Sequence, residues 1–213
     1  MKNRKKPTKP KRATRTLFDR VGAQGWRDSG HFTFTVVSGA LRGWIADRFP
    51  RAPRKVLSVG CGGGELERRL ADAGHRVVGV DVSLAMLKSA HRRGMTAAVL
   101  GDAMNLPFPK ASFDCVLLCE TIGYVDLARA FGEANRVLNK RGRLLITTYA
   151  PAVAAHVRYR KYALDEIVPS LTGAHFRVAE TRFLRVNRNT ATVAPRPEDA
   201  KVLFIDARKD AGC

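Results

Sequence analysis

Short apolar segments that alternate with helical patterns constrain the fold of this chain more than any other feature. Each segment is apolar at nearly every position, and the stretches between them carry apolar residues at helical spacing. Strands that are apolar on both faces are typical of a parallel sheet covered by helices on both sides. Because crossovers between parallel strands are right-handed, we expect a Rossmann-like, doubly wound α/β fold with ligands at the carboxyl ends of the strands. The expected strands are residues 55–60, 76–81, 96–102, 113–120 and 143–149, and the expected helices between them are 65–74, 83–94 and 125–142.

Segments with helical or strand-like patterns also precede and follow this core in the sequence. The first is a helix before the first strand, for which Asp28 or Ser29 is placed as the N-cap. The polar stretch 187–200 is suited to a hairpin-like return between the last two strands. We therefore expect a mostly parallel seven-stranded sheet with a C-terminal antiparallel strand. The additional elements are helices over 32–49 and 152–173 and strands over 175–186 and 201–208.

The turn after the first strand is rich in glycine. In VLSVGCGGGE (56–65), Gly60, Gly62 and Gly64 precede a helix whose free N–H groups point at any ligand held there. Dinucleotide sites use G-x-G-x-x-G, but Glu65 stands where the third glycine would be and would face a pyrophosphate. A nicotinamide or flavin dinucleotide therefore fits poorly. No Gly-Lys-Ser/Thr follows, which excludes a phosphate loop.

Four later segments extend this pattern in a fixed order. With the glycine turn, they resemble the class I S-adenosylmethionine-dependent methyltransferases over about residues 54–150, and more weakly to 208. The resemblance implies a Rossmann-like fold, S-adenosylmethionine as cofactor, S-adenosylhomocysteine as product, and methyl transfer as the activity. The four segments are GVDVSLAML (79–87), LGDAMNLPF (100–108), FDCVLLCE (113–120) and RVLNKRGRLLITTY (136–149).

The same resemblance implies a set of cofactor-binding positions. Asp81 would accept hydrogen bonds from the ribose hydroxyls, and Val82 would pack against the adenine. Asp102 would accept from the adenine amine beside the backbone of Ala103. The glycine turn would receive the methionine end of the cofactor. The remaining cofactor-binding positions that the resemblance implies are Ser58, Gly60, Cys61, Gly62, Gly64, Cys119 and Glu120.

Ser58 departs from the family pattern. The family usually has an aspartate or glutamate two residues before the first glycine, where it helps to fix the ammonium group of the cofactor. A serine brings no charge, and one charge-assisted hydrogen bond is worth ~1–3 kcal/mol. Glu120 could supply the missing charge. Two interpretations stay open: harmless variation, or a protein that either binds the cofactor weakly or has lost catalysis.

Methyl transfer needs orientation, exclusion of water and sometimes a base, but no nucleophile from the protein. Tyr124 and His31 are the candidate bases. Tyr124 follows the fourth strand, and His31 lies at the head of the N-terminal helix, which in this family often covers the cofactor. The stretch CETIGYV (119–125) carries neither Asn/Asp-Pro-Pro-Tyr/Phe nor Pro-Cys. Its sequence disfavours exocyclic-amine and cytosine-C5 nucleic acid methyltransferases.

Charge and composition separate a tail from the body of the chain. The formal net charge is +19, and residues 1–16 are basic, contain prolines and lack periodicity, which predicts a disordered tail that could track RNA. Residues 17–53 would then form a helical cap, and 54–213 the methyltransferase domain. The four cysteines show no metal-ligand or disulfide spacing, and no signal peptide or membrane span is expected. We expect no metal and a cytoplasmic location.

Three functions therefore remain open. The first is a methyltransferase acting on oxygen or nitrogen of a small molecule. The second is an RNA or protein methyltransferase that docks through its basic tail. The third is a non-catalytic binding protein that kept the fold. Salt-dependent RNA binding after removal of residues 1–16 would separate the first two, and cofactor titration would identify the third.

Overall fold

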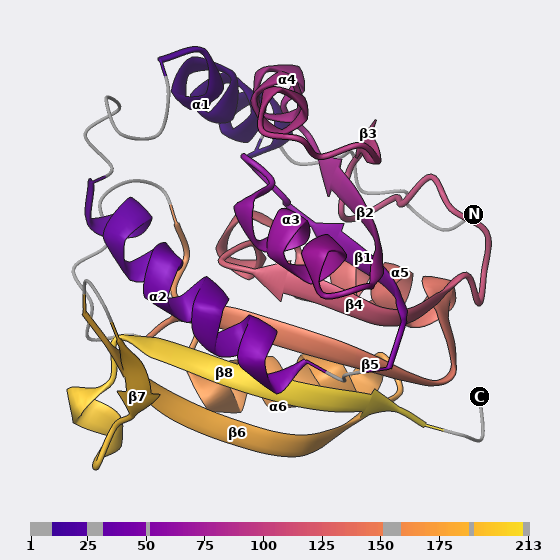
Figure 1. The fold of residues 1–213 in the computed structure, drawn as a ribbon. Helices are drawn as coiled ribbons and strands as arrows, with labels where there is room; N and C mark the ends of the chain where they lie inside the picture. Colours follow the sequence, from indigo (N-terminus) through magenta and orange to yellow (C-terminus); the bar gives the residue numbers. More distant parts are fainter. Residues whose placement is uncertain (1–9, 25–31, 50–51, 151–158, 188–189, 211–213) are drawn as a thin grey trace.

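A computed structural model describes residues 10–24, 32–49, 52–150, 159–187 and 190–210, and it holds a single eight-stranded sheet with helices on both faces (Figure 1). No helix within these residues is both long and apolar enough to cross a membrane. The strands are β1 (Lys55–Val59), β2 (Arg76–Asp81), β3 (Ala98–Leu100), β4 (Phe113–Cys119), β5 (Leu138–Tyr149), β6 (Phe176–Val186), β7 (Ala191–Val193) and β8 (Val202–Lys209). The α-helices are α1 (Pro10–Gln24), α2 (Phe32–Arg48), α3 (Glu65–Asp72), α4 (Leu84–Arg92), α5 (Leu127–Val137) and α6 (Leu164–Gly173), and short 3₁₀ turns cover Ile122–Tyr124 and Pro197–Asp199.

The strand order is β3-β2-β1-β4-β5-β8-β6-β7, which confirms the doubly wound fold. Strands β1 to β5 are parallel, and β1 lies between β2 and β4, so the chain changes direction across the sheet at this point. Strands β8, β6 and β7 run antiparallel to their neighbours. The sheet has one strand more than predicted, because β7 forms within the polar stretch that we expected to be only a return. In a sheet of this kind, the carboxyl ends of β1 and β4 are where a ligand binds.

The core lies in two layers, one on each face of the sheet. Consecutive residues of β1 illustrate this, since Val56 belongs to the apolar cluster with α2 and α3 and Leu57 to the cluster with α5 and α6. Both side chains are fully buried. Burial of a large aliphatic side chain stabilises the fold by about 1.5–3 kcal/mol. This two-sided burial explains why the strands read as continuous apolar runs.

The boundary between α5 and β5 differs from the prediction. The helix expected over 125–142 ends at Val137, and β5 begins at Leu138, which pairs with Phe113 of β4. The register then shifts, so the next pair is Cys115 with Arg143. Pairing with β4 overrides the local helical pattern. Of the helix expected over 152–173, the described part begins only at Leu164, as α6, and residues 151–158 lie outside the described part of the chain.

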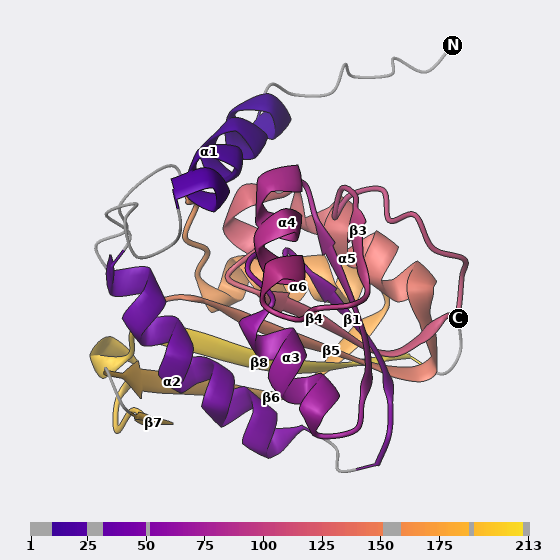
Figure 2. The ribbon, with the colours of Figure 1, turned by 45° about the horizontal axis from the view of Figure 1, so that its top comes forward.

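The prediction of a disordered tail over residues 1–16 is wrong for residues 10–16, which form the first half of α1. Pro10 occupies the first helical position, where its missing N–H costs nothing. Val21 is buried, and Gly22 lies so close to α4 that a β-carbon there would be 2.7 Å from the backbone of Met86. Figure 2 shows α1 lying along α4. This packing on α4 stabilises a helix whose sequence is otherwise rich in arginine.

We expect the substitution Gly22→Val to detach α1 from α4, because the new side chain would collide with the α4 backbone. Trypsin should then cleave at Arg15 and Arg20 faster than in the wild-type protein, as followed by mass spectrometry. Gly39→Val in α2 is the matched control, since a β-carbon at Gly39 meets no neighbouring atom within 4 Å. Equal cleavage rates in the two variants would contradict this account of α1.

Candidate functional site

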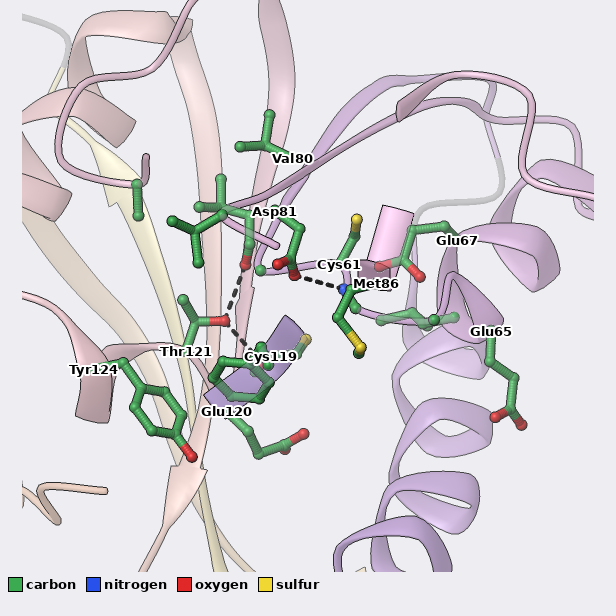
Figure 3. A pocket seen from close by; sticks show the side chains of 18 of the residues that line it. Cys61, Glu65, Glu67, Val80, Asp81, Met86, Cys119, Glu120, Thr121 and Tyr124 are labelled. Atoms are coloured by element: carbon green, nitrogen blue, oxygen red, sulfur yellow. Dashed lines mark hydrogen bonds between the residues drawn. The ribbon is translucent and has the colours of Figure 1, made fainter. Parts of the chain in front are cut away.

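A cavity of about 520 Å³ opens at the carboxyl ends of β1, β2 and β4 (Figure 3). Its floor is formed by the segments that follow these strands and β3. Helices α1 and α2 contribute to its walls. A cavity of this size at the point where the sheet reverses direction is a typical small-ligand site. The residues that α1 and α2 place in its lining are Thr14, Phe18, Leu41, Arg42 and Ile45.

The glycine turn forms one wall of the cavity. Gly60, Gly62 and Gly64 all have positive φ angles, of 75°, 54° and 74°. A β-carbon at Gly60 would also collide with the hydroxyl of Thr121, which lies 3.0 Å from the carbonyl oxygens of Val59 and Cys119. These contacts explain why the turn requires glycine. Gly60 and Gly62 line the cavity, as does Cys61 between them.

Gly64 does not lie in the cavity wall. A β-carbon there would come within 3.0 Å of the Ala90 side chain and 3.1 Å of the Met95 sulfur. The absence of a side chain at Gly64 therefore lets the start of α3 approach α4. The structure assigns this glycine a packing role, whereas the resemblance implied contact with the cofactor.

Asp81 is fixed by the turn that it faces. Its Oδ2 accepts from the Gly62 N–H and its Oδ1 from the Ser83 N–H, both at 2.9 Å. Burial raises the pKa of Asp81, and these N–H groups partly offset that rise. Each oxygen keeps a lone pair, so this buried carboxyl can accept two hydroxyl groups from one ligand. Val82, the next residue, also lines the cavity.

Asp102 and Ala103 line the cavity on the segment after β3, as the resemblance implied, together with Met104. The Asp102 Oδ1 accepts from the Met104 N–H at 3.0 Å, which closes a local turn.

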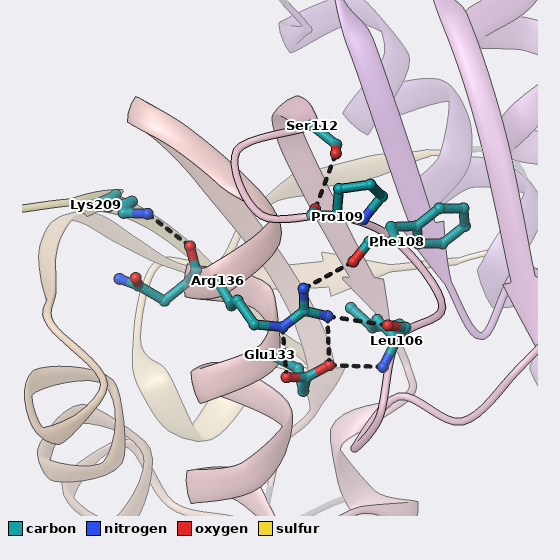
Figure 4. Close-up of polar contacts among 8 residues, drawn as sticks. Leu106, Phe108, Pro109, Ser112, Glu133, Arg136 and Lys209 are labelled. Atoms are coloured by element: carbon teal, nitrogen blue, oxygen red, sulfur yellow. Dashed lines mark hydrogen bonds and ion pairs between the residues drawn. The ribbon is translucent and has the colours of Figure 1, made fainter.

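The loop after Asp102 is hydrogen-bonded to two residues of α5 (Figure 4). Arg136 donates to the carbonyl oxygens of Leu106 and Phe108, at 2.9 and 2.7 Å. Glu133 accepts from the Leu106 N–H at 2.7 Å and pairs with Arg136, which lowers the pKa of Glu133. These bonds anchor the loop after Asp102 to a helix of the core.

Ser58 lies behind the cavity wall rather than in it. Its hydroxyl is buried and donates to Oε1 of Glu67 at 2.5 Å. Glu67, from α3, is only 4% exposed and does line the cavity. Burial raises the pKa of Glu67. The structure thus places a glutamate where the sequence pattern indicated only a missing acid. In the sequence, Glu67 is indistinguishable from the polar residues of an ordinary helix.

Glu120 and Tyr124 lie together at the end of the cavity opposite Glu65 and Glu67 (Figure 3). Glu120 has a positive φ of 48° and is only 8% exposed, and its Oε1 accepts from the hydroxyl of Thr147 at 2.8 Å. Burial raises the pKa of Glu120.

Tyr124 is packed between aromatic rings from two other segments. Its ring makes edge contacts with Phe18 of α1 and Tyr159, at centroid distances of 5.1 and 5.0 Å. Burial and, to a lesser degree, Glu120 raise the pKa of Tyr124 to about 12. The phenol is therefore protonated at neutral pH, so it can donate a hydrogen bond but is a poor base.

Of the remaining residues predicted from the sequence, one lines this cavity and the others lie outside the described residues. Cys119 lines the cavity beside Glu120, and burial raises the pKa of its thiol well above the usual range. His31, Asp28 and Ser29 lie outside the described residues. Phe18, Arg42 and Glu67 are lining residues that the sequence analysis missed, because nothing in their local pattern marks them as facing a ligand.

Comparison with known proteins agrees with this geometry. Residues 57–146 match the family described as a methyltransferase domain. Malonyl-[acyl-carrier protein] O-methyltransferase of Legionella pneumophila is 36% identical over 107 residues, which are 47% of this chain and 38% of that protein. Demethylmenaquinone methyltransferase of Thermus thermophilus is 35% identical over 133 residues, 58% of this chain and 60% of that protein. The chain thus covers less than two thirds of the length of either relative.

A solved structure of similar fold contains a bound ligand. Magnesium protoporphyrin IX methyltransferase from Synechocystis, with S-adenosylhomocysteine bound, has a TM-score of 0.69 to this structure, at 19% identity. The alignment covers 94% of this chain and all of that one. The matched segment 57–146 holds the glycine turn, Asp81 and Asp102. On these grounds, residues 57–146 are similar to the methyltransferase-domain family, and the fold is that of a solved methyltransferase that binds S-adenosylhomocysteine.

Proposed function

We propose that this protein binds S-adenosylmethionine and transfers its methyl group to oxygen or nitrogen of a small molecule. The observation that carries the proposal is the cavity, whose lining brings together the buried carboxyls of Asp81 and Glu120 and the phenol of Tyr124. Side chains of α1 and α2 form part of the cavity wall and limit the space for an acceptor, which favours a small one. The names of the two curated relatives, a malonyl-[acyl-carrier protein] and a demethylmenaquinone methyltransferase, support this choice.

The residues of the cavity fit the cofactor. Asp81 would accept from both ribose hydroxyls, and Asp102 with Ala103 would hold the adenine, as the family resemblance implies. Gly60 and Gly62 leave room for the methionine end beside the turn. When bound, the cofactor supplies a methyl group that its sulfonium centre has already activated, so the protein needs only to position the acceptor and manage its proton.

Glu120 and Tyr124 are placed to do this at the acceptor end. Tyr124 stays protonated and would donate a hydrogen bond to the acceptor, which orients the attacking atom. Glu120, a buried carboxyl beside it, would take the proton that the acceptor loses. The hypothesis that Tyr124 is itself the base is therefore replaced by a division of roles. The edge contact of Phe18 with Tyr124 brings α1 into this end of the cavity, where it helps to exclude water.

The RNA-docking alternative depended on a free basic tail. The structure places residues 10–16 of that tail in α1, which packs along α4 and contributes Phe18 to the lining of the cavity. This arrangement supports the small-molecule alternative over docking through the tail.

Calorimetric titration with S-adenosylhomocysteine tests the proposal directly. We expect binding by the wild-type protein and about 10- to 100-fold weaker binding by Asp81→Ala, because one or two charge-assisted hydrogen bonds to the ribose are lost. Asp47→Ala, at an exposed position of α2, should bind like the wild type. Absence of binding by the folded wild-type protein would overturn the proposal and favour the non-catalytic alternative.

A further inference from the structure

Glu67 is a buried acidic side chain that the roles above do not use. It projects from the first turns of α3 into the cavity, and it is 4% exposed. Its Oε1 accepts from the Ser58 hydroxyl, and no other described side chain donates a hydrogen bond to its carboxyl. Among the described residues no salt bridge to Glu67 forms, although the Arg42 guanidinium, which pairs with Glu65 at 3.1 Å, is near enough to lower the pKa of Glu67.

The Ser58 hydroxyl, the Glu67 backbone N–H and the Arg42 guanidinium only partly offset the burial of the Glu67 carboxyl, whose pKa is raised. An ionised carboxylate held away from water is costly unless a cation compensates it. A ligand that brings a positive charge to Oε2 would remove this cost. A cationic group of a ligand beside Glu67 would therefore be stabilised in this cavity.

Resting on the proposed function, we propose that Glu67 binds the α-ammonium group of the methionine moiety of the cofactor, with Ser58 as the residue that positions it. The ammonium is the cationic group that S-adenosylmethionine and S-adenosylhomocysteine share. Ser58 is small enough to admit the Glu67 side chain and donates the hydrogen bond that fixes it. A carboxylate at position 58 would instead meet that of Glu67 at close range. The acid that serves this end of the cavity thus comes from α3 rather than from β1.

Arg42 completes a surface suited to a zwitterion. Arg42 lines the cavity, and its guanidinium pairs with Glu65 at 3.1 Å and lowers the pKa of Glu67. An amino-acid moiety carries one positive and one negative group on a single carbon. A carboxylate and a guanidinium side by side match that pattern, whereas the adenosine end of the ligand carries neither charge.

The test compares two ligands that differ in this moiety. S-adenosylhomocysteine carries the ammonium, and 5′-methylthioadenosine lacks it. We expect Glu67→Gln to bind S-adenosylhomocysteine about 10- to 100-fold more weakly than the wild type does. Its affinity for 5′-methylthioadenosine should stay within about threefold, which also shows that the variant is folded. Titration calorimetry measures both.

A relocation variant gives an independent readout. Glu67→Ala should lose affinity for S-adenosylhomocysteine, and the double variant Ser58→Asp with Glu67→Ala should recover most of it, since the carboxylate returns from β1 to the same place. A merely structural role of Glu67 would not be rescued in this ligand-specific way.

The outcomes are distinct. Unchanged S-adenosylhomocysteine affinity in Glu67→Gln, or an equal loss for both ligands, would overturn this inference and leave the proposed function in place, provided that the wild-type protein binds. If the folded wild-type protein binds neither ligand, the proposed function fails and this inference fails with it.

Discussion

Replacing Glu120 with glutamine is expected to slow methyl transfer by about 10²- to 10⁴-fold, the usual contribution of a general base. The amide keeps the shape of the side chain and its hydrogen bond with Thr147, but it cannot take the proton of an acceptor. S-adenosylhomocysteine should bind as it does to the wild-type protein. Turnover would be measured as S-adenosylhomocysteine release, with an acceptor identified by screening small alcohols, phenols and amines.

The pH profile should report the same group. Burial raises the pKa of Glu120, and the carboxyl must be ionised to act as a base. The wild-type rate should therefore rise with pH through that raised pKa and then level off, and Glu120→Gln should lose this dependence.

Tyr124→Phe is the companion variant, since it removes the donor and leaves the base. It should retain the ascending pH profile at a lower rate. A selective loss of S-adenosylhomocysteine affinity in Glu120→Gln, with turnover at saturating cofactor unchanged, would contradict this assignment. Glu120 would then belong to the cofactor site, as the family resemblance first implied.

The substitution Asp206→Ala is expected to destabilise the fold by about 3–5 kcal/mol, the usual effect of leaving half of a buried ion pair. Arg143 of β5 donates to both carboxylate oxygens of Asp206 on β8, at 2.8 and 2.7 Å. The Asp206 side chain is 4% exposed, so its loss would leave the Arg143 guanidinium, 21% exposed, without its main partner. Equilibrium unfolding in urea measures the change.

Asp72→Ala provides the control for this measurement. Asp72 pairs with Arg68 at 3.6 Å on the exposed side of α3, and its side chain is 66% exposed. Exposed pairs of this kind contribute about 0–1 kcal/mol. A comparable effect of the two substitutions would contradict the view that the Arg143–Asp206 pair joins β5 to β8.

The sequence predicted the fold well wherever periodicity and burial coincide. The apolar strands β1, β2 and β4 were identified because burial on both faces leaves a continuous apolar run. The start of β5 at Leu138 was missed, since pairing with Phe113 acts over more than twenty residues and leaves no local signal. The helix over residues 10–16 was missed for the same reason, because its stability comes from packing on α4.

Some residues of the candidate site could be predicted from the sequence and others could not. Asp81 and the glycine turn were predictable, because a strand end and a positive φ angle impose residue types that a sequence displays. Glu67 was not, since its burial depends on how α3 packs over Ser58. The serine at position 58 indicated that an acidic side chain is missing there. Only the structure shows that the Glu67 carboxyl lies next to this serine.

The charges that line the cavity bear on how one cofactor molecule would be exchanged for the next. The protein carries a net charge of +19, yet the side chains of this cavity include more carboxyls than guanidinium groups. At physiological ionic strength, charges more than about 8 Å away are largely screened, so the local lining dominates. S-adenosylmethionine enters with one net positive charge, and its product has none. If the protein binds this cofactor as proposed, a lining of this sign would hold the charged donor more tightly than the neutral product, and release of the product would be favoured after transfer. The charged lining residues are Glu65, Glu67, Asp81, Asp102 and Glu120 against Arg42, Arg68 and Arg93.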